Sequence, residues 1–497
     1  MNKEEFTKQE GSVFPGKTYV DALLKHVFYD QRDYLFHAMF QIHRAHVVML
    51  SEQGIIKIED ANLILACVNR IGEMDASSLH YSPDFEDLFF MMESKISQEI
   101  GPDLASMMHI ARSRNDMGEA MYRIVLRKCV LSLIVDMIDV EEALIQQAEE
   151  HLDTVMTAHT HTQPAQPTTF GHYLIAVFDV LERDVNRFWN AFKSINLSPM
   201  GAAAITTTGF PINRERVCDL LGFDGLMENS YDAIGGVDYL LEPATAILTS
   251  MTNTGRWVHD FLRLATVEVG IVKVAAPYVQ ISSIMPQKRN PVSIEHARAL
   301  ASSAVGEALS VVQMIHNTPY GDIVDTEDDL QPHLYRGFDK ASRVYRLMNA
   351  VVRTMEVDKG RAEKQAWKNC ITITEFADVL TREKGLSYCE AHKVSSFLAR
   401  KCVEEKRELL DWQVDDVNEL LKSNVRMRIT FTQEEWKHII SPREFIQRRK
   451  VRGGPNPIEV KRMIEDRKQK WKNHVLQCEK IRTHLNEKEK ALKIFRH

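Results

Sequence analysis

The chain has 497 residues, of which 44% are hydrophobic and 26% are charged. This composition is that of an ordinary globular protein, and it excludes a disordered or fibrous one. The formal net charge of −7 argues against a general affinity for nucleic acids or for a membrane surface. A chain of this length is expected to form two or three domains or one unusually elongated architecture.

Seven cysteines are spread along the chain without a CxxC pair. An odd number at irregular spacing indicates reduced thiols rather than a disulfide framework or a zinc site. The N-terminal residues contain no apolar signal segment, and no stretch reaches the length of a membrane span. We therefore expect a cytoplasmic protein that uses no metal or cofactor, binds no nucleic acid and does not enter a membrane.

Helical periodicity dominates the chain. Apolar residues recur at intervals of three and four over residues 119–152 and over residues 240–274, and both runs exceed the average globular helix. Strand patterns are sparse, since ITITEF at 371–376 alternates only briefly beside helical sequence. These features predict an all-α fold built around a bundle of long helices.

The last part of the chain carries a stripe of residues spaced by seven: Ile464, Trp471, Cys478, Leu485 and Leu492. Such a stripe predicts one long amphipathic helix. Acidic residues interrupt the basic ones around it, so docking on the chain's own bundle or on another subunit is favoured over nucleic-acid binding. We expect an N-terminal, mainly helical domain (1–112), a central long-helix bundle (113–365) and a C-terminal helical domain (366–497).

Short polar segments rich in Pro, Gly, Ser, Thr and Asn separate the central helices, at 160–171, 198–211, 229–236, 282–291 and 317–329. In the fourth, Asn290 and Pro291 are typical of a helix start, because Asn caps free N–H groups and Pro fits the first helical position. That loop is expected to bring Ser282, Ser283, Lys288 and Asn290 to the positive end of a helix. Such an arrangement favours a carboxylate or an oxyanion.

Four ordered motifs carry a resemblance to a known family, and two C-terminal segments agree with it. SSIMPQKRN at 282–290 resembles the signature of the fumarase/aspartase superfamily of lyases. ARSRND at 111–116, THTQPAQPTTFGH at 160–172 and NSYDA at 229–233 resemble the argininosuccinate lyase branch, as do CEAH at 389–392 and RGGP at 452–455. The resemblance implies an elongated three-domain subunit whose central helices form the core of a homotetramer, with active sites shared between subunits.

The resemblance also implies a reaction and roles for individual residues. Fumarate is eliminated from a succinyl compound by anti removal of a proton and the nitrogen, through an aci-carboxylate carbanion. Ser283 matches the catalytic base, which Lys288 and the helix end help to ionise. His161 matches the histidine that faces the leaving nitrogen, and Glu295 matches the carboxylate that orients it.

A further set of residues is expected to bind the dicarboxylate substrate: Ser113, Arg114, Asn115, Thr160, Ser282, Asn290 and Tyr320. Arginine and amide groups at a helix entry suit that task, because they donate hydrogen bonds to carboxylates. Lys288 is expected to contribute to the same binding.

Departures from the family pattern fall on the loop that carries Ser283 or on the part of the site that would hold the leaving amine. Ile281 stands at a Gly position, Met117 at a Gln position, Phe89 at a His position and Val237 at an Arg position. After Tyr320 the sequence becomes the acidic GDIVDTEDD. This acidic loop either binds a cationic leaving group, such as a guanidinium or a polyamine, or is a solvated helix N-terminus that favours acids.

The carboxylate-binding and proton-transfer residues are thus intact while the amine-recognition residues are altered. The function predicted is a carbon–nitrogen lyase that releases fumarate from an N-substituted aspartate, with argininosuccinate as the leading substrate. A lyase for another N-succinyl amine or aminopolycarboxylate, similar to ethylenediamine-disuccinate lyases, is the first alternative. A different member of the superfamily and a non-catalytic structural protein similar to delta crystallins are the others.

Overall fold

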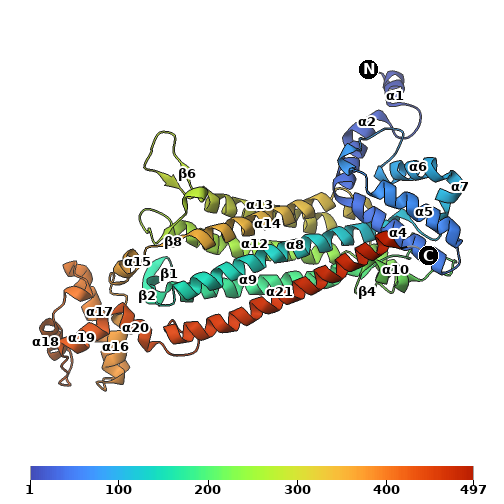
Figure 1. Ribbon diagram of the computed structural model, residues 1–497. Coiled ribbons are helices and arrows are strands. Elements are labelled where there is room, and N and C mark those ends of the chain that lie inside the picture. Colours follow the sequence, from blue (N-terminus) through green and yellow to red (C-terminus); the bar gives the residue numbers. More distant parts are fainter. Residues whose placement is uncertain (1, 496–497) are drawn as a thin grey trace.

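The computed structural model describes residues 2–495 as an elongated, largely helical molecule (Figure 1). Strands are confined to four two-stranded pairs in this described range, so the predicted all-α fold is confirmed. Long helices form the middle of the molecule, and smaller helical groups lie at its two ends. No helix in the described range is long and apolar enough to cross a membrane.

The N-terminal group lies at one end of the bundle and consists of α1 (Lys3–Glu10), α2 (Lys17–Tyr19), the π-helix η1 (Val20–Leu24), α3 (Lys25–Asp30), the π-helix η2 (Gln31–Leu35), α4 (Phe36–Glu52), α5 (Ile58–Gly72), η3 (Ala76–Ser78), α6 (Leu88–Ile100) and α7 (Pro102–Met107). From α2 to α4 the chain is one helical run interrupted by the two π-helical turns. Turns of this kind are frequent at functional sites. Helix α4 is buried along nearly its whole length, including its polar residues Gln41, His43, Arg44 and His46.

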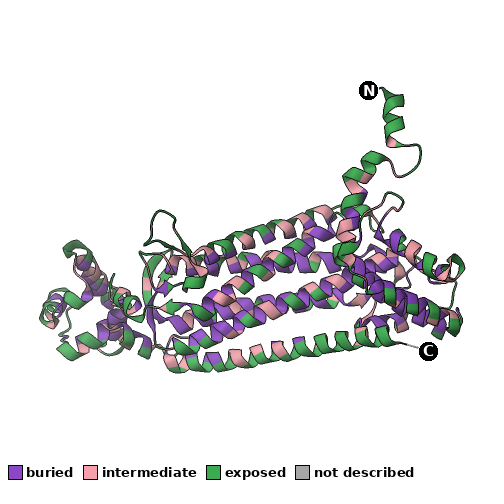
Figure 2. Cartoon of the chain, turned by 45° about the horizontal axis from the view of Figure 1, so that its top comes forward, coloured by how far each residue is buried: buried purple, intermediate pink, exposed green. Residues whose placement is uncertain are grey.

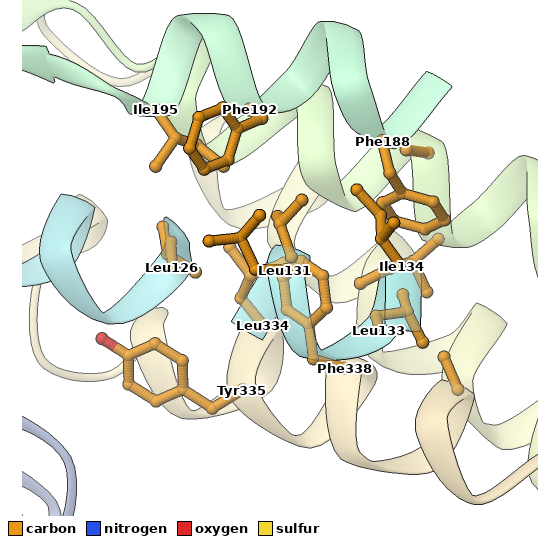
Figure 3. Packing of buried hydrophobic residues seen from close by; sticks show 14 of the residues in the cluster. Leu126, Leu131, Leu133, Ile134, Phe188, Phe192, Ile195, Leu334, Tyr335 and Phe338 are labelled. Atoms are coloured by element: carbon orange, nitrogen blue, oxygen red, sulfur yellow. The ribbon is translucent and has the colours of Figure 1, made fainter. Parts of the chain in front are cut away.

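Five long helices make up the bundle: α8 (Arg114–Glu150), α9 (Phe170–Ile195), α12 (Asp238–Leu264), α13 (Val292–Ile315) and α14 (Gln331–Thr354). The predicted helix over 119–152 is confirmed in α8. This helix packs against both α9 and α14, and apolar side chains from the three interlock in the core (Figure 3). Phe188 of α9 and Phe338 of α14 meet there with ring centroids 6.3 Å apart.

The second predicted long helix is too long by ten residues, since α12 ends at Leu264 rather than near residue 274. The chain turns because the Gly270 N–H donates to the Thr266 carbonyl over 2.7 Å, and Gly270 adopts a positive φ of 59°. Residues 272–273 then form β5, which pairs with β8 (Glu356–Val357) instead of extending the helix.

Shorter elements connect the long helices: β1 (Val155–Thr160), β2 (Gln163–Thr169), β3 (Leu197–Ser198), α10 (Arg214–Leu221), β4 (Gly225–Leu226), α11 (Ser230–Gly235), β5 (Val272–Lys273), η4 (Ala276–Tyr278), β6 (Gln280–Ile281), β7 (Arg289–Asn290), η5 (Val324–Thr326) and α15 (Lys359–Ala366). Several of them carry the motifs described above. The strands pair as β1 with β2, β3 with β4, β5 with β8 and β6 with β7.

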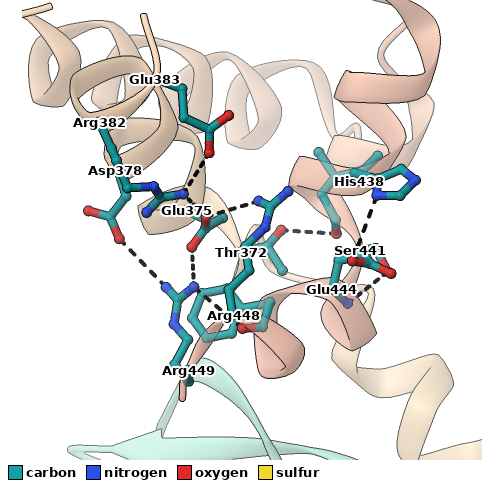
Figure 4. A network of polar contacts seen from close by, with 12 residues as sticks. Thr372, Glu375, Asp378, Arg382, Glu383, His438, Ser441, Glu444, Arg448 and Arg449 are labelled. Carbon is teal, nitrogen blue, oxygen red and sulfur yellow. Dashed lines mark hydrogen bonds and ion pairs between the residues drawn. The ribbon is translucent and has the colours of Figure 1, made fainter. Parts of the chain in front are cut away.

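A C-terminal group with its own core lies at the opposite end of the bundle and contains α16 (Ile373–Arg382), α17 (Tyr388–Glu405), η6 (Leu409–Asp411), α18 (Val414–Asn424), α19 (Gln433–Ile440) and α20 (Pro442–Arg448). The brief strand pattern at 371–376 lies largely in α16. A network of polar contacts joins α16 to α20 (Figure 4). In it the buried carboxylate of Glu375 accepts from Arg382 and Arg448, each over 2.9 Å, and from Arg449.

The predicted tail helix is confirmed as α21 (Pro457–Ile494), which runs back along the bundle beside α8 and α9. Its outer face is exposed, whereas its inner face joins the main core (Figure 2). Arg467 of α21 pairs with Asp179 over 2.8 Å, and His474 Nδ1 lies 3.0 Å from the buried Glu141 Oε2 of α8.

Candidate active site

The first turn of α8 holds three of the predicted binding residues. Ser113 is the N-cap, and its hydroxyl accepts from the Asn115 N–H over 3.3 Å. The Asp116 carboxylate accepts from the Ser113 N–H over 3.0 Å, and also from the N–H groups of Gly201 and Ala203 over 2.9 and 3.1 Å. Asp116 therefore fixes the start of α8 against the 198–211 loop. Sequence reasoning missed this role, although Ser-x-x-Asp is a recognisable variant of a capping box.

Arg114 is held by carboxylates of the segment before α6. Its Nη1 lies 3.2 Å from Asp87 Oδ2 and 3.4 Å from Glu86 Oε1. The guanidinium also covers the ring of Phe90 at 4.9 Å. Arg114 is half exposed, so it is oriented by these contacts while remaining accessible to an anion.

Tyr320 lies near the same end of α8, within the loop between α13 and α14. Its hydroxyl donates to Asp232 Oδ1 over 2.7 Å, and this hydrogen bond raises the pKa of Tyr320 to about 12. The ring stacks on Tyr231 with centroids 5.8 Å apart. In the next residues of the loop, Asp322 Oδ2 accepts from Asn115 Nδ2 over 2.7 Å. The structure thus brings the NSYDA motif, the acidic loop and the ARSRND motif together.

Thr160 and His161 lie at the tip of the β1–β2 hairpin, at the other end of α8. The sequence did not predict this hairpin, because its strands contain two prolines and few residues with strong strand preference. Its two-residue turn has positive φ angles at His161 (50°) and Thr162 (63°). A positive φ at a β-branched residue is strained, and strain of this kind is often retained for function. The side chains of Thr160 and His161 are exposed.

The base of this hairpin connects two of the motifs. Thr169 caps α9 by accepting from the His172 N–H over 3.1 Å. His172 Nε2 in turn lies 3.0 Å from the Gly453 carbonyl in the RGGP segment. The C-terminal motif therefore supports the hairpin that carries His161.

Ser282, Ser283 and Lys288 lie on the loop that connects β6 to β7. Ile281 pairs with Arg289 at the base of this loop, and residues 283–288 are exposed. The loop projects away from the bundle (Figure 1). Ser282 Oγ accepts from the Met285 N–H over 3.1 Å, which shapes the turn and leaves Ser283 on its exposed part.

The predicted helix start at Asn290–Pro291 is displaced by one residue. Pro291 is the N-cap of α13, no side chain caps this helix, and its first residue is Val292. Asn290 cannot act as the cap because its backbone pairs with Gln280 in the β6–β7 ladder. Glu295 lies in the first turn of α13, and its side chain is exposed.

The predicted site residues therefore form separate groups within one chain. Helix α8, with 37 residues, separates Ser113 from the β1–β2 hairpin by roughly 55 Å. Helix α13, with 24 residues, separates the β6–β7 loop from Tyr320 by roughly 36 Å. No small dicarboxylate spans such distances. In the described range, no group of three or more His, Cys, Asp or Glu side chains is arranged to hold a metal ion.

Comparison with known proteins gives the chain its family. Residues 38–306 match the family described as Lyase, and residues 370–447 match the one described as Argininosuccinate lyase C-terminal. Argininosuccinate lyase 2 of Agrobacterium fabrum (strain C58) is 40% identical over 451 residues, 90% of each chain. Argininosuccinate lyase of Methanocaldococcus jannaschii is 36% identical over 424 residues, 85% of each chain.

Solved structures agree with this fold. EDDS lyase in complex with formate matches with a TM-score of 0.86 and 31% identity, over 95% of this chain and 94% of that one. The 3-carboxy-cis,cis-muconate lactonizing enzyme from Pseudomonas putida matches with a TM-score of 0.72 over 91% of this chain and 100% of that one; at 18% identity this likeness shows the fold alone.

The long-helix bundle and the matched motifs define a lyase of the fumarase/aspartase superfamily. Within it, the chain belongs to the argininosuccinate lyase branch, and it is an enzyme, a carbon–nitrogen lyase. The predicted family and the predicted enzyme class are both confirmed.

Proposed function

We propose that this enzyme cleaves argininosuccinate to arginine and fumarate. The observation that carries the proposal is the 40% identity to Argininosuccinate lyase 2 over 90% of both chains, in a sequence that retains Ser283, His161, Lys288 and Asn115. Since these residues carry proton transfer and carboxylate binding in the family, their retention supports an intact reaction centre.

In this proposal Ser283 removes the proton from the succinyl methylene. A free hydroxyl is a very poor base, so the serine needs a neighbouring cation and a water-free surrounding to ionise. Lys288 is five residues away on the same exposed loop and supplies the cation. The exposed side chains of Ile281 (72%) and Ile284 (83%) give the loop an apolar surface that favours closure over the substrate.

The developing carbanion is stabilised as an aci-carboxylate by donors aimed at its oxygens. Ser282, Lys288 and Asn290 act from the β6–β7 hairpin, while Ser113, Arg114 and Asn115 act from the start of α8. Each donor of this kind contributes roughly 10²–10³-fold to the rate. Thr160 and Tyr320 complete the binding of the two carboxylates.

His161 donates a proton to the departing nitrogen while the C–N bond breaks, and Glu295 keeps the imidazole charged and oriented. The exposed position of His161 at a strained hairpin tip supports this role, because the side chain is free to reach a substrate held by other elements.

The enzyme is proposed to act as a cytoplasmic homotetramer with shared active sites. The separation of the site groups along α8 and α13 supports this, because copies of the chain are needed to bring them together. A groove of about 960 Å³ along α9, α12 and α13, lined by Val177, Val180 and Val305 together with polar residues such as Arg256 and Asp260, offers a surface for such contacts.

The test is to incubate the purified enzyme with argininosuccinate, following fumarate by its ultraviolet absorbance and identifying arginine by mass spectrometry. Stoichiometric formation of both products is expected. The absence of fumarate at high enzyme concentration, with the enzyme folded and tetrameric, would overturn the proposal.

A further inference from the structure

A cavity of about 310 Å³ lies beside Arg114 and Asn115, at the start of α8. One of its walls is apolar and comes from the helical run through η1 and from α8, with Leu23, Leu24, Val27, Met117 and Met121. Residues of the acidic loop before α14 also line the cavity. A cavity of this size with one apolar wall suits a small ligand that carries an alkyl chain.

The charged residues that line this cavity are mostly acidic. Arg114 is its one cation in the described range, and Asp87 and Glu86 already pair with it. The remaining carboxyl groups belong to Glu119, Asp322, Glu327, Asp328 and Asp329, and among residues 2–495 none of these five has an ion pair with a basic side chain. The carboxyl groups of the cavity therefore outnumber its one guanidinium beside the expected substrate site.

The acidic loop does not serve as a cap for the helix that follows it. Helix α14 has Leu330 as its N-cap, and no side chain caps it. Asp328 instead accepts from Gln31 Nε2 across the cavity, and Asp322 accepts from Asn115. Two of its carboxylates thus contact residues of the cavity lining, which argues against a merely solvated helix N-terminus.

Glu119 gives a second, independent sign of a ligand. It lies one turn into α8, its residue is only 7% exposed, and it lines the cavity. Within the described part of the chain, no group meets the distance and angle of a hydrogen bond to its buried Oε2. The Tyr239 hydroxyl and the Arg123 guanidinium lie near Glu119, and Arg123 donates to the Ser194 carbonyl over 2.8 Å. Natural proteins rarely leave a buried carboxylate oxygen unsatisfied, because its desolvation is costly.

The pKa values of two carboxyl groups in the cavity are raised, in agreement with their burial. Burial raises the pKa of Glu119 to about 8. Burial and the neighbouring Asp322 raise the pKa of Glu327 to about 8. Both shifts arise mainly because burial disfavours the charged carboxylate, and a bound cation would lower both pKa values.

We propose that this acidic cavity binds the cationic far end of the leaving amine, with Glu119 as its specificity-determining residue. The enzyme then prefers N-succinyl adducts whose amine ends in an ammonium group without a carboxylate, such as the adduct of 4-aminobutylguanidine. The inference rests on the proposed function, since it requires the same elimination. Ser283 takes the methylene proton, the C–N bond breaks, and fumarate and the aminoalkylguanidine leave.

Charge explains the preference. Argininosuccinate would bring the carboxylate of its arginine part into a cavity lined by carboxylates, whose one guanidinium pairs with Asp87 and is proposed to bind the succinyl part. An ammonium group alone meets attraction, and the four-carbon chain meets the apolar wall. Charge interactions of this kind are large enough for a preference of at least about tenfold.

The test compares kcat/KM of the full-length enzyme for three synthetic substrates, namely argininosuccinate, the succinyl adduct of 4-aminobutylguanidine and the succinyl adduct of butylguanidine. The last lacks the ammonium group but is otherwise matched to the second. We expect the ammonium adduct to exceed both others by about tenfold or more. Glu119→Gln and Asp328→Asn should each reduce this ratio severalfold, whereas Glu434→Gln, an exposed acid of α19, should not change it.

The outcomes separate the two proposals. If argininosuccinate is cleaved but the ammonium adduct is no better than the butylguanidine adduct, the inference is wrong and the proposed function stands. If no adduct yields fumarate, the proposed function itself fails. Calorimetry with Ca²⁺ and Mg²⁺ alone provides a further check, because tight binding that Glu119→Gln abolishes would make the cavity a metal site and overturn the inference.

Discussion

Asn115 Nδ2 donates to Asp322 Oδ2 over 2.7 Å, so a carboxylate of the chain itself occupies a donor that is proposed to bind a substrate carboxylate. The interaction connects the first turn of α8 to the acidic loop before α14. It also places the proposed dicarboxylate site directly beside the proposed amine cavity.

Asp322→Ala should strengthen the binding of fumarate, because it frees Asn115 and removes a negative charge from the site. We expect the inhibition constant of fumarate to fall by about threefold to tenfold. Asp325→Ala, in the same loop but outside the cavity lining, is the control and should leave this constant unchanged. A higher constant in Asp322→Ala would contradict the proposed role of Asn115.

Ser283→Ala should reduce kcat by at least about 10³-fold while leaving the fold intact. Stability should be retained because residue 283 is exposed on a loop and packs in no core. Circular dichroism and a thermal melt would establish this. Ser423→Ala, at an exposed position on α18, is the matched control. Near-normal turnover in Ser283→Ala would reject the serine as the base.

Mixtures of two inactive variants should regain activity if the sites are shared. Ser283→Ala and Asn115→Ala disable groups that lie at opposite ends of the bundle. After the two variants are unfolded together and reassembled at equal amounts, roughly a quarter of the sites should combine an intact Ser283 with an intact Asn115 from another subunit. Activity measurements on the separated and mixed tetramers would decide. A mixture as inactive as its components would mean that each site lies within one subunit.

The sequence predicted the parts of the fold that depend on local patterns. Helix α8 and the tail helix α21 follow from apolar spacing alone, because a long amphipathic or buried helix repeats its signal over many turns. Pairing between distant segments has no such signal. The β6–β7 ladder holds Asn290 extended, and the β5–β8 pair accompanies the early end of α12, so both local predictions failed there.

The same distinction applies to the site. The motifs identified candidate residues such as Ser283 and Arg114, but their separation along α8 and α13 became visible only in three dimensions. Glu119 carried no motif, since an isolated Glu in a helix is normally solvated. Its burial results from helices that lie more than a hundred residues away in sequence, including the one that carries Tyr239.

His474→Ala should destabilise the docking of α21 on α8. His474 Nδ1 lies 3.0 Å from Glu141 Oε2, and Glu141 is fully buried with its other oxygen unpaired. Removing the imidazole leaves this carboxyl without a partner, which should cost about 3 kcal/mol in the free energy of unfolding. The exposed Lys472→Ala should change it by less than about 0.5 kcal/mol. Denaturant unfolding at constant protein concentration provides the measurement.

Replacing the pair together distinguishes a specific interaction from simple loss of packing. The double variant Glu141→Leu/His474→Leu should recover most of the stability that His474→Ala loses, because no buried polar group is then left unsatisfied. A double variant as unstable as the single one would mean that the helices dock through other contacts.

The stability of the enzyme should depend on pH through the acidic cavity. The pKa values of Glu119 and Glu327 are raised to about 8 in the folded protein, from ordinary values of 4.5. Between these values the folded state binds more protons than the unfolded one, so the free energy of unfolding falls as pH rises from 4.5 to 8. Glu119→Gln removes one of these groups. As pH rises from 5 to 9, the free energy of unfolding of Glu119→Gln should therefore increase by about 1–3 kcal/mol relative to that of the wild type. Thermal melts at fixed protein concentration across this range, with Glu434→Gln as the control, would reveal the gain as diverging curves; parallel curves would show that Glu119 is already ionised in the folded enzyme.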